Sequence, residues 1–251
     1  MTGAVWPEGY GRHVLAEVDS TNAQAARVLT DLAGPTWIMA TRQTAARGRR
    51  GRAWAMPEGN FAASLVLRVD ERAEQVALRS FVTSLALFDA LVAVTGRAEN
   101  FALKWPNDVL LNGGKLAGIL LESAGMGAGA GHVIIGIGVN LVAAPGSQEV
   151  EPGALRPVSV LSETGVDIGQ EVFLDHLANA YAGWEHQFVT YGFAPVREAW
   201  LMRAAKLGEV ITARTGKTEV SGSFETVDER GQLVLKTRQG RQAIPAADVF
   251  F

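Results

Sequence analysis

The sequence predicts an α+β fold, in which a larger domain that mixes helices with strands is followed by a small all-β domain. Helical and strand-like hydrophobic patterns both occur up to about residue 205, whereas only short strand-like runs separated by turn residues follow Lys206. The length of 251 residues fits one domain with a small appendage, and 48% apolar residues supply material for a buried core. We therefore place a domain boundary near Lys206, between residues 1–205 and 206–251.

The first predicted elements are a strand, a helix and two further strands. The run EVDSTNAQAARVLTDLAGP predicts the end of a strand, a helix capped by an oxygen of DST (19–21), and a stop at Gly34-Pro35. WIMAT (37–41) and NFAASLVLRVD (60–70) have the length and apolar content of strands, and the first of them is expected to be buried.

A long core helix and a hairpin are predicted next. Apolar residues recur at helical spacing from Glu74 to the helix stop at Gly96. FALKWPNDVLLNGGKLAGILLES (101–123) predicts two strands joined by the turn Asn112-Gly113-Gly114, because Asn and Gly tolerate positive φ. HVIIGIGVNL (132–141) predicts another buried strand.

The remaining elements are a glycine-rich loop, two helices and a set of short strands. AGMGAGAG (124–131) predicts a flexible loop, and helices are expected over 170–191 and 195–205. After Lys206 the runs EVITART, VSGSFETV, GQLVLKT and RQAIPAADVF predict the strands of a small barrel.

The charge distribution points to a small anionic ligand. The net charge is −3 and the basic residues are concentrated in one loop, whereas a nucleic-acid-binding domain usually carries a basic excess over a whole face. There is no cysteine, which excludes disulfides, thiolate metal sites and a cysteine nucleophile, and the four histidines lack metal-ligand spacing. No signal peptide and no apolar run long enough to span a bilayer is found, which predicts a soluble cytoplasmic protein.

The stretch TAARGRRGRAW (44–54) places four arginines within six positions and separates them with glycine. They are Arg47, Arg49, Arg50 and Arg52. Glycine allows conformations in which backbone amides and guanidiniums face one ligand, and guanidinium forms forked contacts with phosphate or carboxylate. The pattern predicts an anion-binding loop, although a solvated basic loop or an RNA contact explains the loop alone at least as well.

A second polar cluster lies in the predicted hairpin. KWPNDV (104–109) brings Lys, Asn and Asp to a strand-to-turn junction, and Lys115 follows across the turn. Two lysines, an amide and a carboxylate suit a nucleotide phosphate with Mg²⁺, which often takes only one or two protein carboxylates. Each lysine taken singly is better explained as a surface residue whose aliphatic stem lies on apolar surface.

Two further motifs are weak by themselves. DSTN (19–22) places short polar side chains at a predicted helix start, where they cap the helix or bind a polar ligand group. GIGVN (136–140) ends a predicted buried strand, and a lone G-x-G there is equally explained by close packing against a neighbour.

In this order and spacing, the four motifs resemble the catalytic part of the biotin protein ligases, which attach biotin to a lysine of a carrier protein. The family pattern is S-T-N, G-R-G-R-x-G-R-x-W, K-W-P-N-D, K-x-x-G-I-L-x-E and G-x-G-x-N. The matching segments are 20–22, 46–54, 104–108, 115–122 and 136–140, and the resemblance covers essentially the whole chain. Two positions depart from the pattern. Ala46 replaces the usual first Gly, and the C-terminal DVFF carries no arginine for an adenine contact.

The resemblance implies a mixed β-sheet with helices mainly on one face, of the class II aminoacyl-tRNA synthetase/biotin ligase type, and an SH3-like barrel after Lys206. It also implies a two-step reaction. Biotin and Mg·ATP give biotinyl-5′-AMP and pyrophosphate, and the biotinyl group then passes to a lysine of the biotin carboxyl carrier protein. ATP and Mg²⁺ are the implied cofactors, and biotin is the implied substrate.

The resemblance further assigns roles residue by residue. Lys115 and Arg49 are the expected catalytic residues, which act through their charge, and Asp108 is expected to face Mg²⁺. The expected biotin-binding residues are Ser20, Thr21, Asn22, Gln43, Arg47, Gly48, Arg49, Lys115 and Gly118. The expected nucleotide-binding residues are Arg50, Arg52, Trp54, Asn107, Asp108 and Asn140. Because an empty arginine loop repels itself, we expect it to be mobile without ligand and to order over the bound anions.

Only about a dozen residues precede HVLAEVDSTN, where bifunctional members of the family carry a winged helix-turn-helix. We therefore expect a ligase without repressor function and with no DNA or membrane partner, and a homodimer is left open. Among neighbouring enzymes, the octanoyltransferases use a cysteine and the lipoate ligases lack the R-G-R-R-G-R loop. A nucleic-acid-binding module and a ligand sensor without catalysis are the alternatives from other classes.

Overall fold

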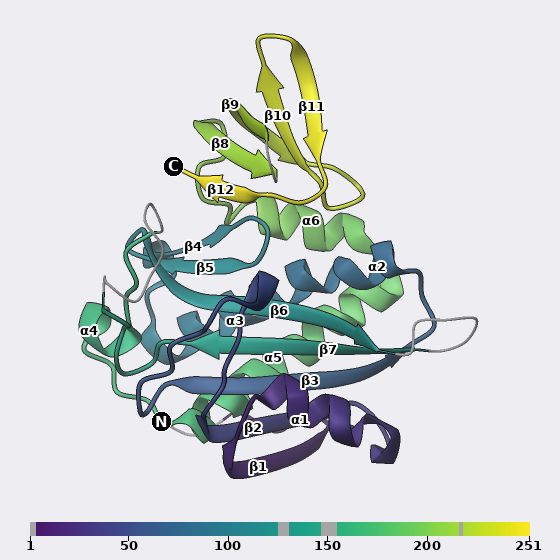
Figure 1. The fold of residues 1–251 in the computed structure, drawn as a ribbon, viewed down its shortest axis with the longest axis vertical. Coiled ribbons are helices and arrows are strands. Elements are labelled where there is room, and N and C mark those ends of the chain that lie inside the picture. The colour runs from purple at the N-terminus through teal and green to yellow at the C-terminus, as the bar shows by residue number, and fades with distance from the viewer. Residues whose placement is uncertain (1–3, 125–130, 147–154, 216–217) are drawn as a thin grey trace.

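The computed structural model describes residues 4–124, 131–146, 155–215 and 218–251 and contains two β-sheets with helices packed against them (Figure 1). The strands of the larger sheet are β1 (Gly11–Val18), β2 (Thr36–Gln43), β3 (Phe61–Val69), β4 (Phe101–Lys104), β5 (Asp108–Leu111), β6 (Gly114–Ala124) and β7 (Gly131–Val139). Their order is β1-β2-β3-β7-β6-β5-β4. β1 pairs with β2 in parallel and the other neighbours are antiparallel, so the predicted mixed sheet is confirmed.

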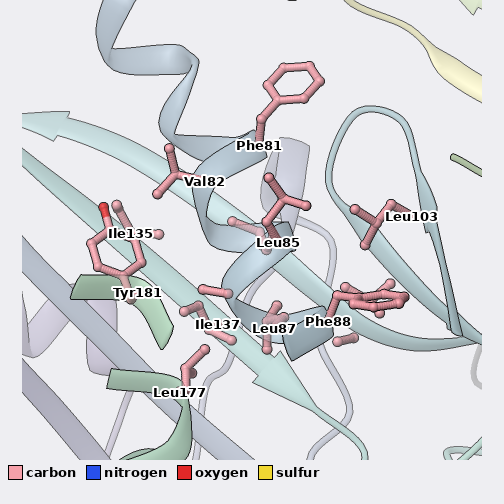
Figure 2. Packing of buried hydrophobic residues seen from close by; sticks show 14 of the residues in the cluster. Phe81, Val82, Leu85, Leu87, Phe88, Leu103, Ile135, Ile137, Leu177 and Tyr181 are labelled. Atoms are coloured by element: carbon pink, nitrogen blue, oxygen red, sulfur yellow. The ribbon is translucent and has the colours of Figure 1, made fainter. Parts of the chain in front are cut away.

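Helices cover the two faces of this sheet unequally. The long helices α3 (Arg79–Thr95) and α5 (Gln170–Tyr191) pack together on one face, and the short helix α1 (Thr21–Val28) lies on the other (Figure 1). Figure 2 shows Leu85 of α3 and Tyr181 of α5 in the same core as Ile135 and Ile137 of β7. The central strands are buried on both faces, which explains why they are continuous apolar runs.

The opposite face of the sheet carries a much smaller apolar cluster. Ala25 of α1 packs there with Ile38, Val66 and Ile134, which come from β2, β3 and β7. Because successive side chains of a strand alternate between faces, the even-numbered residues of β7 that follow Ile134 point to this same side. The face is therefore only partly covered by α1, and the rest of it is free to carry a site.

Several predicted elements differ in detail. The helix expected from Glu74 is divided into α2 (Ala73–Ala77) and α3, although it ends at Gly96 in the left-handed conformation as expected. The segment 101–123 forms three strands rather than two, because a turn at the cis Trp105-Pro106 bond separates β4 from β5. The predicted hairpin turn between β5 and β6 is confirmed, with positive φ at Asn112 and Gly113.

One helix in the described part of the chain, Ala73–Thr95, has the length and composition of a membrane span. The expectation that no apolar run reaches this length is therefore wrong. Inside the protein 72% of its most apolar stretch is buried, as in the core helix of a globular domain. Its apolar side chains pack against α5 and against the strands of the sheet.

The C-terminal part of the chain forms the smaller sheet. After α4 (Val160–Thr164), α5 and α6 (Phe193–Leu201), the strands are β8 (Val210–Thr215), β9 (Thr218–Val227), β10 (Leu233–Thr237), β11 (Gly240–Ile244) and β12 (Asp248–Phe250). They are antiparallel in the order β11-β10-β9-β8-β12. The run RQAIPAADVF thus supplies two strands. β11 and β12 are edge strands of the described sheet, so closure into a barrel stays a prediction, and most of the loop predicted over 124–131 lies outside the described residues.

Candidate active site

A cavity of about 440 Å³ lies on the sheet face that α1 leaves partly open. It is bounded by the start of α1, the arginine loop, the β4–β5 turn, β6, β7 and the C-terminal strand β12. All fifteen residues that the sequence assigned to a site line it, namely Ser20, Thr21, Asn22, Gln43, Arg47, Gly48, Arg49, Arg50, Arg52, Trp54, Asn107, Asp108, Lys115, Gly118 and Asn140. The fold therefore brings four motifs together that are up to 120 positions apart, counting from Ser20 to Asn140.

Glycines form the floor of this cavity. A Cβ atom at Gly136 would lie 2.2 Å from Oδ1 of Asn22, and one at Gly138 would lie 2.8 Å from the ring of Trp54. At Gly118 the same ring would be 3.1 Å away. The G-x-G of the fourth motif is thus required for close approach of two cavity side chains as well as for strand packing.

One end of the cavity, the amide end, is made by Ser20, Thr21, Asn22 and Gln43. The first three are buried, with 3–6% of their surface exposed, and they are held by hydrogen bonds within the protein. The Thr21 N–H donates to Oε1 of Gln43 at 2.7 Å, and Nδ2 of Asn22 donates to Glu122 at 2.6 Å. Ser20 is the N-cap residue of α1 but makes no side-chain capping bond, so the capping interpretation is wrong for this side chain.

A buried serine on the neighbouring strand supports the amide end. Oγ of Ser64 in β3 lies 2.8 Å from Oγ1 of Thr21 and 2.6 Å from Oδ1 of Asn22. Ser64 is fully buried, and a hydroxyl in that position stabilises the fold only while it is hydrogen bonded. The rotamers of Thr21 and Asn22 are therefore fixed before any ligand binds.

The other end, the arginine end, is made by Arg49, Arg50, Arg52, Asn107, Asp108 and Lys115. The loop closes on itself through the Gly48 N–H to the Arg52 carbonyl at 2.7 Å and the Trp54 N–H to the Ala46 carbonyl at 3.0 Å. Its tip is a 3₁₀ turn, Arg49–Gly51. Ala46 has no positive φ, so the methyl group at this departure from the family pattern causes no backbone strain.

Arg49 is the least exposed of the four loop arginines. It donates to Oδ1 of Asn107 at 3.2 Å, and Asn107 in turn donates to the Ile119 carbonyl at 2.6 Å. Burial lowers the pKa of Arg49, while the carboxylates Asp248 and Asp108 oppose that effect. The partial desolvation of the guanidinium strengthens its attraction for an anion.

Asp108 lies between two lysines. Its Oδ1 is 2.8 Å from Nζ of Lys115, and its Oδ2 is 3.8 Å from Nζ of Lys104. Oδ1 is buried without a hydrogen bond of good geometry, so the contact with Lys115 is an ion pair rather than a directed bond. Burial lowers the pKa of Lys104, with Asp108 opposing. Lys115 also lies 5.6 Å from the ring centre of Trp54.

The residues present do not build a resident metal site. The described part of the chain contains no group of three His, Cys, Asp or Glu side chains that could hold a metal ion. Asp108, the expected ligand, is already paired with two ammonium groups. One carboxylate does suffice for a Mg²⁺ ion that arrives on nucleotide phosphates, because Mg²⁺ keeps water and substrate oxygens as its other ligands.

Sequence reasoning missed three residues that support the cavity: Ser64, Glu122 and Asp248. Ser64 was visible as the one hydroxyl in the apolar core of its strand run, and Glu122 as the last position of K-x-x-G-I-L-x-E. Nothing in the sequence around Asp248 indicates its role, because its partners are about 200 positions away. Of the two carboxylates, Glu122 accepts from Arg47 at 3.2 Å and Asp248 from Arg50 at 2.5 Å.

Comparisons with known proteins agree with this arrangement. The chain matches the model of the Biotin/lipoate A/B protein ligase family over residues 14–140 and that of the Biotin protein ligase C terminal domain over 206–251. It is 58% identical over 238 residues to the biotin--[acetyl-CoA-carboxylase] ligase of Paracoccus denitrificans, covering 95% of this chain and 99% of that one. It is 30% identical to the bifunctional ligase/repressor BirA of Bacillus subtilis, covering 96% of this chain and 75% of that one.

The solved structures give the same result. The biotin protein ligase from Aquifex aeolicus in complex with biotin and ATP has a TM-score of 0.83 at 26% identity, covering 95% of this chain and 98% of that one. A mixed sheet with a cavity lined by these motifs, followed by a small antiparallel sheet, is the architecture of the ligases that attach biotin or lipoate to proteins. The chain belongs to the biotin/lipoate A/B protein ligase family.

Proposed function

We propose that this protein is a biotin–protein ligase, which activates biotin with Mg·ATP and transfers it to a lysine of a biotin carboxyl carrier protein. The observation that carries the proposal is that a buried polar end and a cationic end meet in one cavity. The relatives support it. The Paracoccus denitrificans protein is named for acetyl-CoA carboxylase, and the Aquifex aeolicus structure was solved with biotin and ATP.

In the first half-reaction, a carboxylate oxygen of biotin attacks the α-phosphorus of ATP. A new P–O bond forms, the bond to the bridging oxygen of the β-phosphate breaks, and pyrophosphate leaves. Both reactants are anions, so positive charge must hold them together and stabilise the charge that develops at phosphorus. Lys115 and Arg49 supply that charge, with Arg47 and Gly48 beside them at the biotin carboxylate.

Biotin binds at the amide end. Its ureido ring is polar and is buried there, so it needs hydrogen-bonding partners, which Ser20, Thr21, Asn22 and Gln43 offer. Gly118 leaves room in the floor beside Trp54. A site built to hydrogen-bond a substrate group rejects an analogue that lacks it by about 10⁴–10⁵-fold. That discrimination separates biotin from lipoate without an editing step.

The nucleotide binds at the arginine end. Arg50, Arg52 and Trp54 face its phosphates and base, and Asn107 and Asn140 shape the wall. Nδ2 of Asn140 donates to the Val158 carbonyl at 3.0 Å and thereby holds the segment beside Lys115. Asp108 would hold the Mg²⁺ ion that ATP carries, and that ion would neutralise part of the phosphate charge.

In the second half-reaction, the ε-amine of the carrier lysine attacks the acyl carbon of biotinyl-5′-AMP. The amide bond forms, AMP leaves and the amine loses a proton, so the ligase needs no nucleophile of its own. Residues 1–205 form the catalytic domain and residues 206–251 the C-terminal domain, a division that the match over 206–251 supports. We expect neither DNA nor a membrane as a partner, leave a homodimer open, and place the enzyme in the cytoplasm.

The test is pyrophosphate release from Mg·ATP by the purified protein with biotin, with lipoate or with neither acid, in the presence of a biotin-acceptor domain. We expect release with biotin alone and label on one acceptor lysine. Release with lipoate in place of biotin would move the chain to the lipoate ligases. If a folded protein releases no pyrophosphate with either acid, the cavity is a binding site without catalysis.

A further inference from the structure

The C-terminal sheet reaches into the cavity with its last strand. Asp248, Val249 and Phe250 of β12 line the cavity, although they belong to the smaller sheet, and Phe251 after them lines it too. β12 pairs antiparallel with β8, and this pairing sets Asp248 opposite Arg214. The backbone of Asp248 is therefore held by a sheet that is separate from the one that carries the motifs.

Two guanidiniums of the arginine loop converge on this carboxylate. NH1 of Arg50 and NH2 of Arg52 lie 2.5 Å and 3.4 Å from the same oxygen, Oδ2 of Asp248. The side chain of Asp248 is 20% exposed, whereas those of the two arginines are 44–48% exposed. The carboxylate is thus the fixed and better shielded partner, and it anchors two longer and more mobile side chains.

The backbone of the loop gives independent evidence for an anchor. Arg50 has φ 57° and ψ 25°, the left-handed conformation that is unfavourable for a residue with a Cβ atom. Such a conformation persists where surrounding contacts impose it. In the described structure, the side-chain contact that Arg50 makes is the one to Asp248. The neighbouring Arg47 and Arg49 are tied instead to Glu122 of β6 and to Asn107 in the β4–β5 turn.

We propose that Asp248 is a positioning residue, through which the C-terminal sheet holds the tip of the arginine loop over the cavity before the nucleotide binds. The inference rests on the proposed function, because it takes the phosphates of ATP as the anions that Arg50 and Arg52 receive. A loop that is already in place loses less conformational freedom when ATP binds, so the anchor strengthens ATP binding without touching the reacting atoms. Repulsion among the loop arginines, which favours an open loop, is offset in part by this carboxylate.

The first test uses trypsin, since the loop contains four cleavage sites. In the protein without ligands, Asp248→Ala and Asp248→Asn are expected to raise the rate of cleavage after Arg49, Arg50 or Arg52 about fivefold or more, with the sites located by mass spectrometry. Asp248→Glu keeps the charge and should restore at least half of the protection. Glu225→Gln is the matched control, because it breaks an exposed pair with Arg241 in the same sheet away from the cavity.

The second test is the steady-state rate of pyrophosphate release. Asp248→Asn should raise KM for ATP about tenfold, with kcat and KM for biotin changed less than threefold. Unchanged cleavage of the loop in folded Asp248→Asn protein would overturn the proposal. A lower KM for ATP would overturn it as well, because the carboxylate would then compete with phosphate. If the wild-type protein released no pyrophosphate, the proposed function would fail, while the trypsin result would still decide whether Asp248 anchors the loop.

Discussion

The two ends of the cavity are built in opposite ways. At the amide end, short side chains are buried and hydrogen bonded to one another and to Ser64. At the arginine end, long side chains are partly exposed and are held by ion pairs such as Arg50 with Asp248. The first end is rigid before a ligand arrives, and the second depends on charges that a ligand can replace.

This difference matches what each end has to do. A neutral ring is recognised by directed hydrogen bonds, which need fixed partners and tolerate little displacement. Two anions are brought together by positive charge, which acts over a longer range and tolerates a moving loop. The glycines Gly136 and Gly138 lie beneath the junction of the two ends, one against Asn22 and the other against Trp54.

The largest effect is expected from Lys115→Met, which removes the ammonium group and keeps the aliphatic stem. The rate of pyrophosphate release should fall about 10²–10³-fold, as for other groups that stabilise charge in a transition state. Biotin affinity, measured by calorimetry without ATP, should change much less. Lys236→Met, an exposed lysine of the C-terminal sheet, is the control. A loss of less than threefold would remove Lys115 from the charge-stabilising role.

The residues behind that prediction could be identified from the sequence, whereas the residues that hold them in place could not. The arginine loop and Lys115 are visible because their charge density stands out in an acidic chain, and α5 was predicted with its observed bounds. The contact of Ser64 with Asn22 joins residues 42 positions apart, and it exists only because α1 lies on β3. The strand-to-turn junction at 104–109 was predicted, but the division of the segment 101–123 into three strands rather than two was not.

The second prediction concerns the loop that covers the adenylate. Arg49→Gly removes a partly buried charge and its bond to Asn107. A hydrogen bond to a charged group contributes about 1.5–3 kcal/mol, so retention of the adenylate should weaken about 10–100-fold. Released biotinyl-5′-AMP would then label lysines of a bystander protein. Labelling is measured with a mixture of the acceptor domain and a protein without one, and Arg238→Gly, an exposed turn residue, serves as the control.

If Arg49→Gly labels only the acceptor domain, the loop does not hold the adenylate, and the arginine end acts in the chemical step alone. If bystander labelling rises while the rate of pyrophosphate release stays within tenfold of wild type, retention and chemistry are separate properties of the loop. Either result tells whether the arginine end of the cavity needs all of its charges for both tasks.

A pair of glycine substitutions separates the two ends most directly. A Cβ atom at Gly136 would displace Asn22, and one at Gly138 would displace Trp54. Overpacking of this kind costs about 1–3 kcal/mol, which corresponds to about tenfold or more in an equilibrium constant. Gly136→Ala should therefore raise KM for biotin, and Gly138→Ala should raise KM for ATP. Gly169→Ala, where a Cβ atom meets nothing within 4 Å, is the control. Equal effects of both variants on both substrates would show that the floor does not divide the cavity.

The smallest effect is expected at the residue that links the two ends. Glu122 accepts from Nδ2 of Asn22 at 2.6 Å and from NH2 of Arg47 at 3.2 Å, with 35% of its side chain exposed. Glu122→Gln removes the charge but keeps an acceptor for Asn22. Because a partly exposed ion pair contributes about 0.2–1 kcal/mol, KM for biotin should rise less than about fivefold and KM for ATP should stay unchanged.

Glu122→Ala sharpens the same comparison, because it leaves the buried amide of Asn22 without its acceptor. A buried amide left without an acceptor costs about 1–3 kcal/mol. This variant should therefore raise KM for biotin about tenfold, clearly more than Glu122→Gln does. Glu17→Gln, which breaks an exposed pair with Arg42 outside the cavity, should match the wild type. If Glu122→Gln and Glu122→Ala are equally impaired, the charge on Arg47 matters more than the fixed amide. The amide end would then depend on the arginine loop for its geometry.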